Sequence, residues 1–248
     1  MSGHSKWATI KRDKEKTDSQ RGAIFTKIGR EIAIAVKQGG ADPFNNPRLA
    51  TVIAKAKSNN MPNDNIQRSI KKASGELGSV NYEEMVYEGY GPGGSAVMLD
   101  ILTDNKNRAA ADIRHIFDRA GGSLGGSGSV AFMFSRKAVV CVKVPAGKTE
   151  DDVMELGLEY EAEDIVNEGD DYYTIYAEPT ELNKIRSACE KAGYTIDTAE
   201  LRMIPVNTMD LDDNKYNSFI KMIDNFEAND DVQNVYHNVN LRPETEEE

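Results

Sequence analysis

The glycine-rich stretch GYGPGG at 89–94 comes closest to a motif that carries chemistry. Its glycines have the spacing of the dinucleotide-binding fingerprint, which works when they follow a strand and open a helix whose N-terminus faces a pyrophosphate. Here they precede a strand-like stretch, AVMLDIL, and Pro92 lies among them. A hairpin turn is therefore the better interpretation. Neither this stretch nor GGSLGGSGS at 121–129 ends in the Gly-Lys-Ser/Thr of a phosphate-binding P-loop.

The other reactive side chains are dispersed along the chain. The three histidines, His4, His115 and His237, have no second ligand at the spacing of a recognised zinc motif. Cys141 and Cys189 match no nucleophile signature and are too few for a disulfide framework. A hydrolase is an alternative, with an active site built from carboxylates that come together only on folding. No spacing of Asp or Glu along the sequence indicates such a site. We therefore expect no catalytic residue, no cofactor and no metal ion.

Charge is divided unequally along the 248 residues, whose formal net charge is -11. Residues 1–78 hold 15 Lys and Arg against 7 Asp and Glu, a net of +8, and residues 79–248 hold 15 against 34, a net of -19. This segregation indicates a basic region that meets a polyanion and an acidic remainder that does not. The alternative is that the two parts attract each other.

The residues that we expect to bind nucleic acid are the cations of the basic region and its one tryptophan. Each cation could neutralise a phosphate, and Trp7 could stack on an unpaired base. Ordinary solvated surface is the competing interpretation for any single one of them. They are Lys6, Trp7, Lys11, Arg12, Lys14, Lys16 and Arg21, followed along the predicted helices by Lys27, Arg30, Arg48, Lys55, Lys57, Arg68, Lys71 and Lys72.

Hydrophobic periodicity predicts three helices in the basic region. The first ends at Gly39-Gly40, the second begins at the N-cap pair Asn46-Pro47, and the third begins near Asn63. A further helix from about Asn105 to Ala120 follows a strand. Asn105, Asn107 and Arg108 at its start are a second expected nucleic-acid contact, because a helix N-terminus attracts anions.

Strands and helices alternate after residue 78. Residues 130–205 read strand–helix–strand–strand–helix–strand, with VAFMF at 130–134 within the first strand region, and this is the split arrangement of a ferredoxin-like unit. Residues 86–120 and 211–239 each hold an incomplete set of elements. We expect these two flanks to pair into one domain with the complete unit inserted between them.

The predicted class is α+β, with a three-helix bundle-like domain and two ferredoxin-like α/β domains, one inserted in the other. The boundaries are 1–78 for the basic helical domain with its flexible arm, 79–129 with 206–243 for the discontinuous domain, 130–205 for the inserted acidic domain, and 244–248 for an acidic tail. Residues 150–171 hold eleven Asp or Glu. A solvated surface is the first interpretation of these acids, and a surface for basic partners such as ribosomal proteins is the second.

The first 23 residues lack the apolar core of a secretory signal, and the acidic residues among them are atypical of an organelle transit peptide. The longest apolar stretches have strand length, well short of a membrane span. We expect a cytoplasmic protein without a membrane partner. Its oligomeric state is not predicted.

Seven segments together resemble the successive signatures of the YebC/PmpR family, and the resemblance covers nearly the whole chain. They are GHSKWA at 3–8, RGAIFTKIGREI at 21–32, GGADPFNNPRL at 39–49, NNMPNDNI at 59–66, YEGYGPGG at 87–94, LTDNKNRAAADIRHIF at 102–117 and GGSLGGSGSVAFMF at 121–134. The resemblance implies a helical domain followed by two α/β domains. It also implies a cytoplasmic, DNA-binding transcriptional regulator, and it extends to relatives that activate mitochondrial translation or relieve ribosome stalling at proline runs.

The sequence thus predicts a non-enzymatic, nucleic-acid-binding regulator of gene expression. A transcriptional regulator should select promoter DNA over bulk DNA by several kcal/mol. The alternative, a translation factor, should contact ribosomal RNA or tRNA through the basic domain and co-sediment with ribosomes.

We expect the joint replacement of Lys6, Lys11, Arg12 and Lys16 by alanine to weaken nucleic-acid binding. With about five phosphates neutralised in the native complex, log K should fall with log[salt] at a slope near -4 to -5, and the variant should show a shallower slope. Titration of labelled nucleic acid at several salt concentrations measures both quantities. An unchanged affinity and slope would remove the N-terminal arm from the interface.

Overall fold

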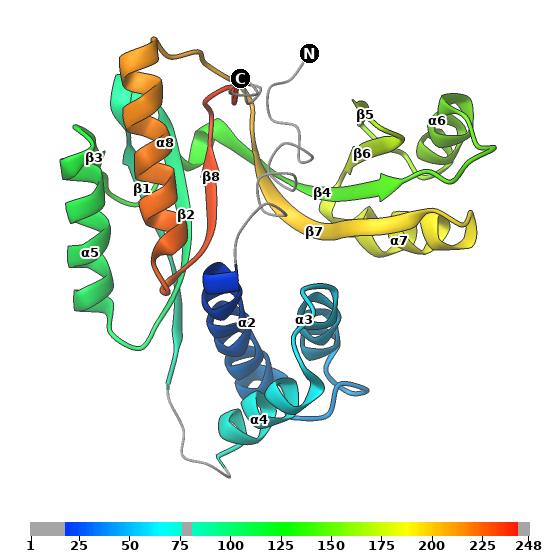
Figure 1. Ribbon diagram of the computed structural model, residues 1–248, viewed down its shortest axis with the longest axis horizontal. Coiled ribbons are helices and arrows are strands. Elements are labelled where there is room, and N and C mark those ends of the chain that lie inside the picture. The colour runs from blue at the N-terminus through cyan, green and yellow to red at the C-terminus, as the bar shows by residue number, and fades with distance from the viewer. Residues whose placement is uncertain (1–17, 76–80, 243–248) are drawn as a thin grey trace. The chain divides into compact units, whose positions relative to one another are not determined.

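The computed structural model describes residues 18–75 and 81–242, with only the backbone of residues 18–21 (Figure 1). These residues form two compact units. The helix–sheet unit comprises residues 18–131 and 211–237, and the inserted unit comprises residues 132–210 and 238–242. The chain thus leaves the helix–sheet unit, builds most of the inserted unit, and returns.

Three helices open the helix–sheet unit: α2 (Asp18–Gly39), α3 (Pro47–Ser58) and α4 (Asn63–Ala73). The Asn46 side chain accepts the Leu49 N–H at 3.0 Å, so the predicted N-cap of α3 is confirmed. One apolar face of each helix contributes to a shared core. Its fully or nearly fully buried members include Ile28, Ile32, Leu49, Val52, Ile66 and Ile70.

The sheet of the same unit has the order β3-β1-β2-β8, with antiparallel neighbours throughout. A hairpin of β1 (Glu83–Tyr90) and β2 (Ala96–Thr103) forms its centre, and the short 3-10 turn η1 (Pro92–Gly94) joins the two strands. The glycine-rich stretch therefore makes a hairpin connection, as predicted. β3 (Ser123–Leu124) pairs with β1, and β8 (Val232–His237) pairs with β2. The two flanks of the chain do share one sheet.

Two helices cover one face of this sheet, α5 (Lys106–Arg119) and α8 (Asp213–Ala228), which lie side by side in Figure 1. Phe117 of α5 and Phe226 of α8 are fully buried and meet edge to face, with ring centroids 4.9 Å apart. These apolar contacts hold α5 against α8. The start of α5 lies beside the loop between α8 and β8, where the polar site described below is found.

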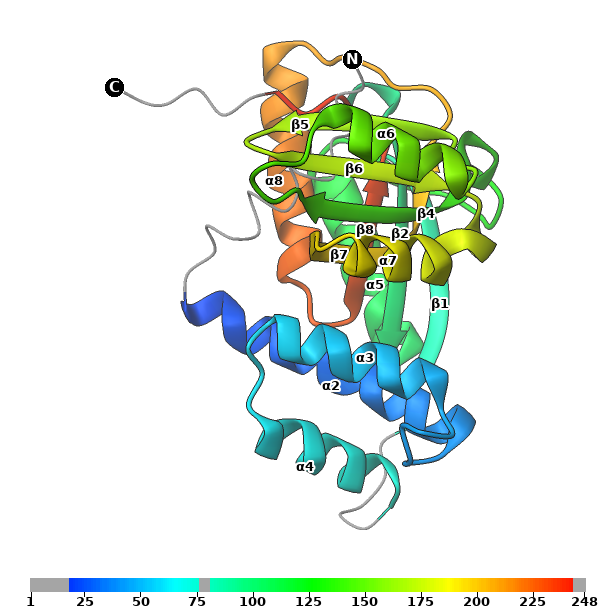
Figure 2. The ribbon, with the colours of Figure 1, turned by 90° about the vertical axis from the view of Figure 1, so that its right-hand side faces the viewer.

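The inserted unit has the predicted order of elements: β4 (Phe134–Lys143), α6 (Glu150–Glu159), β5 (Asp164–Gly169), β6 (Tyr172–Ala177), the 3-10 turn η3 (Pro179–Glu181), α7 (Leu182–Lys191) and β7 (Thr195–Pro205). Its antiparallel sheet has the order β5-β6-β4-β7. Helices α6 and α7 pack on one face (Figure 2), where Val153 and Ile185 join the core of Val140, Val142 and Ile175.

The predicted α+β class, with helices followed by two antiparallel sheets, is confirmed. The domain boundaries at residues 78, 129 and 205 stay predictions. Cys141 and Cys189 are both free and buried in the inserted unit, and burial raises the pKa of the Cys189 thiol to about 12. That thiol carries little thiolate at neutral pH and is a core residue.

The strand predicted for VAFMF is wrong in its first part. Residues 131–133 form the 3-10 turn η2 (Ala131–Met133), and β4 begins only at Phe134. The cause is Glu88 of β1, which is buried and whose carboxylate accepts the N–H groups of Gly128, Val130 and Ala131 at 2.7–2.8 Å. Because a carboxylate takes these N–H groups, they are not available to a neighbouring strand.

We expect Glu88→Gln to destabilise the protein by about 2–3 kcal/mol, because hydrogen bonds to a buried charge are lost and an amide N–H2 meets backbone N–H groups. Burial by itself raises the pKa of Glu88, but the three backbone hydrogen bonds outweigh it and hold the pKa below its ordinary value of 4.5. The stabilisation is therefore complete above pH 4.5 and is lost as the pH falls through the lower pKa of the folded protein.

Urea unfolding at neutral pH and at several lower pH values measures this effect. The difference between native protein and variant should shrink on acidification. Glu84→Gln, on the same strand but exposed, is the matched control and should cost less than about 1 kcal/mol. A pH-independent difference would contradict the role given to the Glu88 charge.

Candidate nucleic-acid interface

The predicted nucleic-acid-binding residues of the arm lie outside the described part of the chain. These are Lys6, Trp7, Lys11, Arg12, Lys14 and Lys16. Arg21 lies in α2, and its side chain is not described. The eight predicted cations of α2–α4 are all described, and they fall into two groups.

The first group is engaged within the protein. Lys27 donates to the Glu227 carbonyl oxygen at 2.6 Å, and Lys55 pairs with Glu31 at 2.6 Å. Arg48 pairs with Glu84 and donates to Gln38. Arg30 is paired with Asp231. For these four residues the structure gives a contact that sequence reasoning did not foresee.

The second group comprises Lys57, Arg68, Lys71 and Lys72, here called the exposed cation set. All four are exposed, and none has a hydrogen bond or ion pair to another described side chain. Three of them occupy α4 at spacings of three and four residues, which place them on one face of that helix. Ile66 and Ile70 face the core from the opposite side. Burial of α4's apolar face thus presents the three cations of this helix to solvent.

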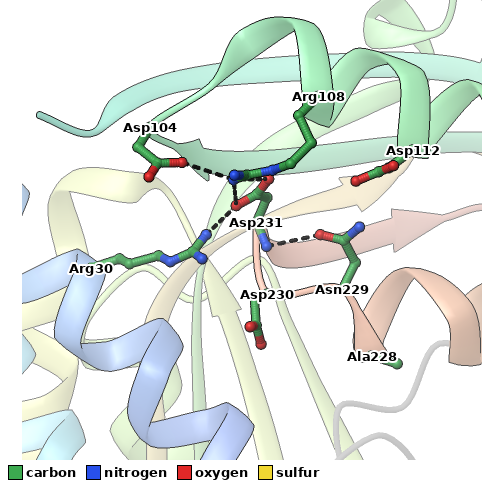
Figure 3. A pocket seen from close by; sticks show the side chains of 8 residues that line it. All are labelled: Arg30, Asp104, Arg108, Asp112, Ala228, Asn229, Asp230 and Asp231. Atoms are coloured by element: carbon green, nitrogen blue, oxygen red, sulfur yellow. Dashed lines mark hydrogen bonds and ion pairs between the residues drawn. The ribbon is translucent and has the colours of Figure 1, made fainter. Parts of the chain in front are cut away.

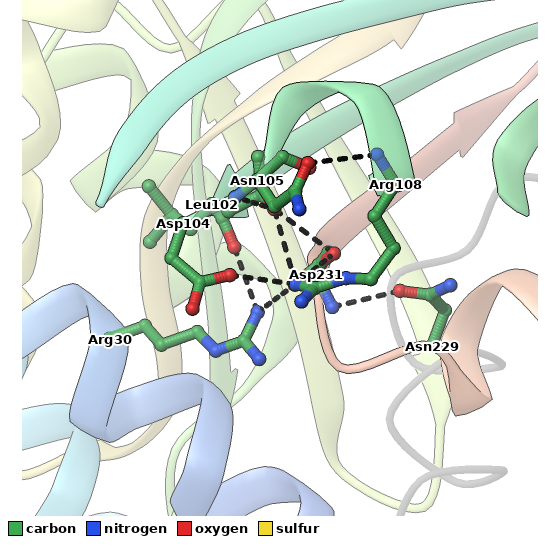
Figure 4. Close-up of polar contacts among 8 residues, drawn as sticks. Arg30, Leu102, Asp104, Asn105, Arg108, Asn229 and Asp231 are labelled. Atoms are coloured by element: carbon green, nitrogen blue, oxygen red, sulfur yellow. Dashed lines mark hydrogen bonds and ion pairs between the residues drawn. The ribbon is translucent and has the colours of Figure 1, made fainter. Parts of the chain in front are cut away.

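The second predicted contact, at the start of α5, has a different chemistry from that expected. The Asn105 side chain accepts the Arg108 N–H at 3.1 Å and so caps the helix. The Arg108 guanidinium donates to Asp104 at 2.8 Å and to both carboxylate oxygens of Asp231 at 3.0 and 3.1 Å (Figure 4). Asn107 is exposed. Contact of these residues with nucleic acid stays a prediction. The two acidic partners of Arg108 disfavour it, because they already neutralise the guanidinium.

An open depression of about 380 Å³ lies beside this helix start (Figure 3). Its lining contains two arginines and four aspartates, a formal excess of two negative charges that disfavours a phosphate. The lining residues are Arg30, Asp104, Arg108, Asp112, Ala228, Asn229, Asp230 and Asp231.

Asp231 is the centre of this polar site. Its side chain is only 5% exposed and lies between Arg30 of α2 and Arg108 of α5. Thr103 at the end of β2 donates a third hydrogen bond at 3.1 Å. Burial by itself raises the pKa of Asp231, but the hydrogen bonds from Arg30 and Arg108 and the charge of Arg30 lower it below its ordinary value of 3.8. Asp231 is therefore ionised at neutral pH and holds both arginines.

Through Arg30, the same polar site also attaches α2 to the sheet. Its guanidinium, besides pairing with Asp231, donates to the Leu102 carbonyl oxygen at 2.9 Å and lies 5.4 Å from the ring centre of Tyr82. The Arg30 side chain is only 12% exposed. It therefore joins the helical part of the unit to the sheet. Sequence reasoning missed Asp231 because it lies 201 residues from Arg30 and 123 from Arg108, with no local pattern to mark it.

Metal-binding clusters and membrane-spanning helices are both absent from the described part of the chain. Residues 18–75 and 81–242 contain no cluster of three His, Cys, Asp or Glu side chains placed to hold a metal ion. Within the same residues, every helix is too short or too polar to cross a membrane.

Comparison with known proteins identifies the family. A family described as "TACO1/YebC protein N-terminal domain" matches residues 5–76, and "TACO1/YebC second and third domain" matches residues 82–239. The chain belongs to the TACO1/YebC family. The predicted resemblance to YebC/PmpR proteins is thereby confirmed.

Relatives in several bacteria share the full length of the chain. A protein of Acetivibrio thermocellus named "Probable transcriptional regulatory protein" is 55% identical over 96% of this chain and 98% of its own. A similarly named protein of Thermoanaerobacter pseudethanolicus is 51% identical over the whole of both chains. The crystal structure of a conserved hypothetical protein from Aquifex aeolicus matches with a TM-score of 0.82 at 40% identity, covering 94% of this chain and 96% of that one.

We expect Asp231→Ala to destabilise the helix–sheet unit by about 3 kcal/mol or more, because it leaves the buried Arg30 guanidinium without its counter-charge. Chemical unfolding measures the loss. Asp230→Ala, one residue away and exposed, is the matched control and should change stability by less than about 0.5 kcal/mol.

The pH dependence gives a second readout. Because the pKa of Asp231 is lowered by folding, its contribution is complete above pH 3.8 and is lost as the pH falls through the folded-state pKa. Equal stabilities of the two variants at neutral pH would contradict the role of this ion pair.

Proposed function

We propose that the protein is a non-enzymatic, nucleic-acid-binding regulator of gene expression, acting as a DNA-binding transcriptional regulator. The observation that carries the proposal is the exposed cation set. Four positive charges on α3 and α4 face solvent, whereas four other cations, two on α2 and two on α3, are engaged by groups within the protein. The names of the relatives are consistent with this function.

Phosphate binding is the chemistry that such a surface favours. Lysine and arginine side chains neutralise phosphates and release condensed counterions, which gives an affinity that depends on salt but little on sequence. Arg68 and Lys71, or Arg68 and Lys72, are close enough along α4 to contact adjacent phosphates. We include the cations of the N-terminal arm in the proposed interface on the basis of the sequence alone.

The charge of the inserted unit favours a second candidate target, the ribosome. Residues 132–210 hold 8 Lys and Arg against 17 Asp and Glu. An acidic unit is repelled by long duplex DNA but attracted to basic proteins. A translation factor would place the exposed cation set on ribosomal RNA or tRNA and the inserted unit beside basic ribosomal proteins. Co-sedimentation with ribosomes, compared with retention on promoter DNA at the same salt concentration, separates the two targets.

We expect the joint replacement of Lys57, Arg68, Lys71 and Lys72 by alanine to weaken nucleic-acid binding roughly 100-fold at 0.15 M salt and to reduce the salt slope by about 3. Fluorescence anisotropy with labelled DNA and RNA, repeated at four salt concentrations, measures both. Thermal unfolding should change little, since all four side chains are exposed.

The matched control removes four positive charges from the inserted unit instead. Lys143, Lys148, Lys184 and Lys191 are exposed there and are replaced together by alanine. If binding follows net charge alone, the two quadruple variants will lose affinity equally, and the proposed interface is wrong. If neither the native protein nor the control variant binds nucleic acid, the proposed function itself is wrong.

A further inference from the structure

Helix α6 of the inserted unit exposes two apolar side chains. Leu158 is 79% exposed and Met154 is 36% exposed, and their spacing of four residues places them on one face of the helix. Val153 and Gly157 are buried and face the core from the other side. The helix therefore has a second apolar surface, which contributes nothing to the core of the unit.

Close packing fixes this orientation of α6. A Cβ at position 157 would lie 2.2 Å from Cδ1 of Ile165, so the helix approaches β5 more closely than any residue except glycine permits. At the start of the helix, Thr149 and Asp152 form a capping box in which Asp152 accepts the Thr149 N–H at 2.7 Å. Because Gly157 must face β5, rotation of α6 cannot bury the adjacent Leu158.

A row of carboxylates lies beside the exposed apolar pair. Asp151, Glu155 and Glu159 are exposed, and none has a hydrogen bond or ion pair to another described side chain. Their spacing of four residues places them next to one another along the helix, and like charges at this spacing repel. The outer face of α6 thus combines apolar surface with negative charge that has no counter-charge within the described chain.

The helix itself does not account for these charges. Acidic residues in the first turn of α6 lie near the positive end of the helix dipole, where they are stabilising. Glu159 instead closes the last turn, where the dipole disfavours negative charge, and that turn holds no basic residue. Glu155 is repelled from both sides, by Asp151 and by Glu159. A partner with positive charge would relieve this repulsion.

Charge also determines which class of partner fits. Residues 132–210 hold 8 Lys and Arg against 17 Asp and Glu. Nucleic acid, an anionic lipid surface and a second copy of the same helix are all negatively charged and are repelled by this unit. A basic protein segment is attracted to it, and an aliphatic side chain on such a segment would cover Leu158.

We propose that the outer face of α6, comprising Asp151, Met154, Glu155, Leu158 and Glu159, docks a basic segment of another protein. An aliphatic side chain of that segment covers the apolar pair, and its lysine or arginine side chains pair with the carboxylate row. Apolar contact supplies the affinity, and complementary charge selects the partner. The apolar area is small, so the contact is a transient one. This inference adds a protein partner to the proposed function and does not depend on the exposed cation set.

Site-specific cross-linking identifies the partner. Photoreactive benzoylphenylalanine replaces Leu158 of the full-length protein in its native cells, and it replaces Val206 in the matched control. Val206 is 64% exposed and donates its N–H to the Met133 carbonyl oxygen beside the start of β4, whereas α6 follows the end of that strand. Position 158 should cross-link to a protein segment with an excess of lysine and arginine, and position 206 should not.

A synthetic peptide with the sequence of the cross-linked segment then measures affinity for the full-length protein. Leu158→Ser should weaken binding about 5- to 30-fold, as the loss of an interface anchor does. Glu155→Gln combined with Glu159→Gln should weaken it about 2- to 10-fold at low salt and less at high salt, because salt screens exposed charges. Thermal stability of this charge variant should be unchanged or higher, since the substitutions remove repulsion, so unfolding cannot explain its loss of binding.

The control variants alter the same unit away from α6. Val206→Ser matches the apolar substitution. Asp170→Asn combined with Glu190→Gln removes two other exposed negative charges. Both controls should change the affinity for the peptide less than about twofold. Equal losses in the two charge variants would mean that binding follows net charge, and the docking face is then wrong.

The remaining outcomes separate this inference from the proposed function. A cross-link from position 158 to nucleic acid, to a second copy, to residues 1–17 of the same chain or to an acidic segment overturns the docking face. A yield no higher than that of position 206 overturns it as well. Nucleic-acid affinity, measured on the same α6 variants, should not change. A failed docking face therefore leaves the proposed function standing, and absence of nucleic-acid binding leaves the docking face standing.

Discussion

The ion pair between Arg30 and Asp231 is the interaction on which the arrangement of the helix–sheet unit depends. It joins a helix near the start of the chain to the loop that precedes its last strand, and it is almost entirely removed from solvent. Removing two charges from water is costly, and their attraction offsets that cost only where further hydrogen bonds complete the site. Thr103, Arg108 and the Leu102 carbonyl supply those bonds. A buried pair of this kind specifies one orientation of α2 on the sheet, because any other leaves a charge unpaired.

The same interaction determines which cations remain for an external ligand. A count of charges includes Arg30 and Arg108 among the available cations, but both are paired with Asp231. Lys27, Arg48 and Lys55 are also engaged within the unit. The positive charge of the basic region is therefore partly structural. What remains for phosphates among the described residues is concentrated toward α4, whose apolar side is buried and whose cationic side is not.

Features determined over short sequence distances were predictable. The N-cap at Asn46 contacts a group three residues away, and α5 follows its apolar spacing to within a residue or two of the expected bounds. The order of strands and helices in the inserted unit was predicted from the alternation and periodicity of apolar residues. The pairing of the two flanks was predicted because each flank holds only part of the strands and helices of a complete domain. The fold class therefore emerged from the sequence.

Features determined by distant partners were not predictable. VAFMF has the composition of a strand, yet its first N–H groups bind a carboxylate on β1 that lies 42 and 43 residues upstream. Nothing local marks Glu88 as buried. The division of the basic residues into engaged and exposed groups was missed for the same reason, since Arg30 and Lys27 contact groups about 200 residues away. Composition gave the sign of the surface charge, and only tertiary structure separated the two groups.

An overall acidic protein can nevertheless bind a polyanion through such a region. At physiological ionic strength, exposed charges separated by more than about 8 Å are largely screened, so the net charge of -11 acts weakly at any one contact. Direct contacts between cations and phosphates are short and keep most of their energy. The acidic inserted unit adds no attraction for a polyanion, so the proposed binding depends on local contacts with the exposed cation set.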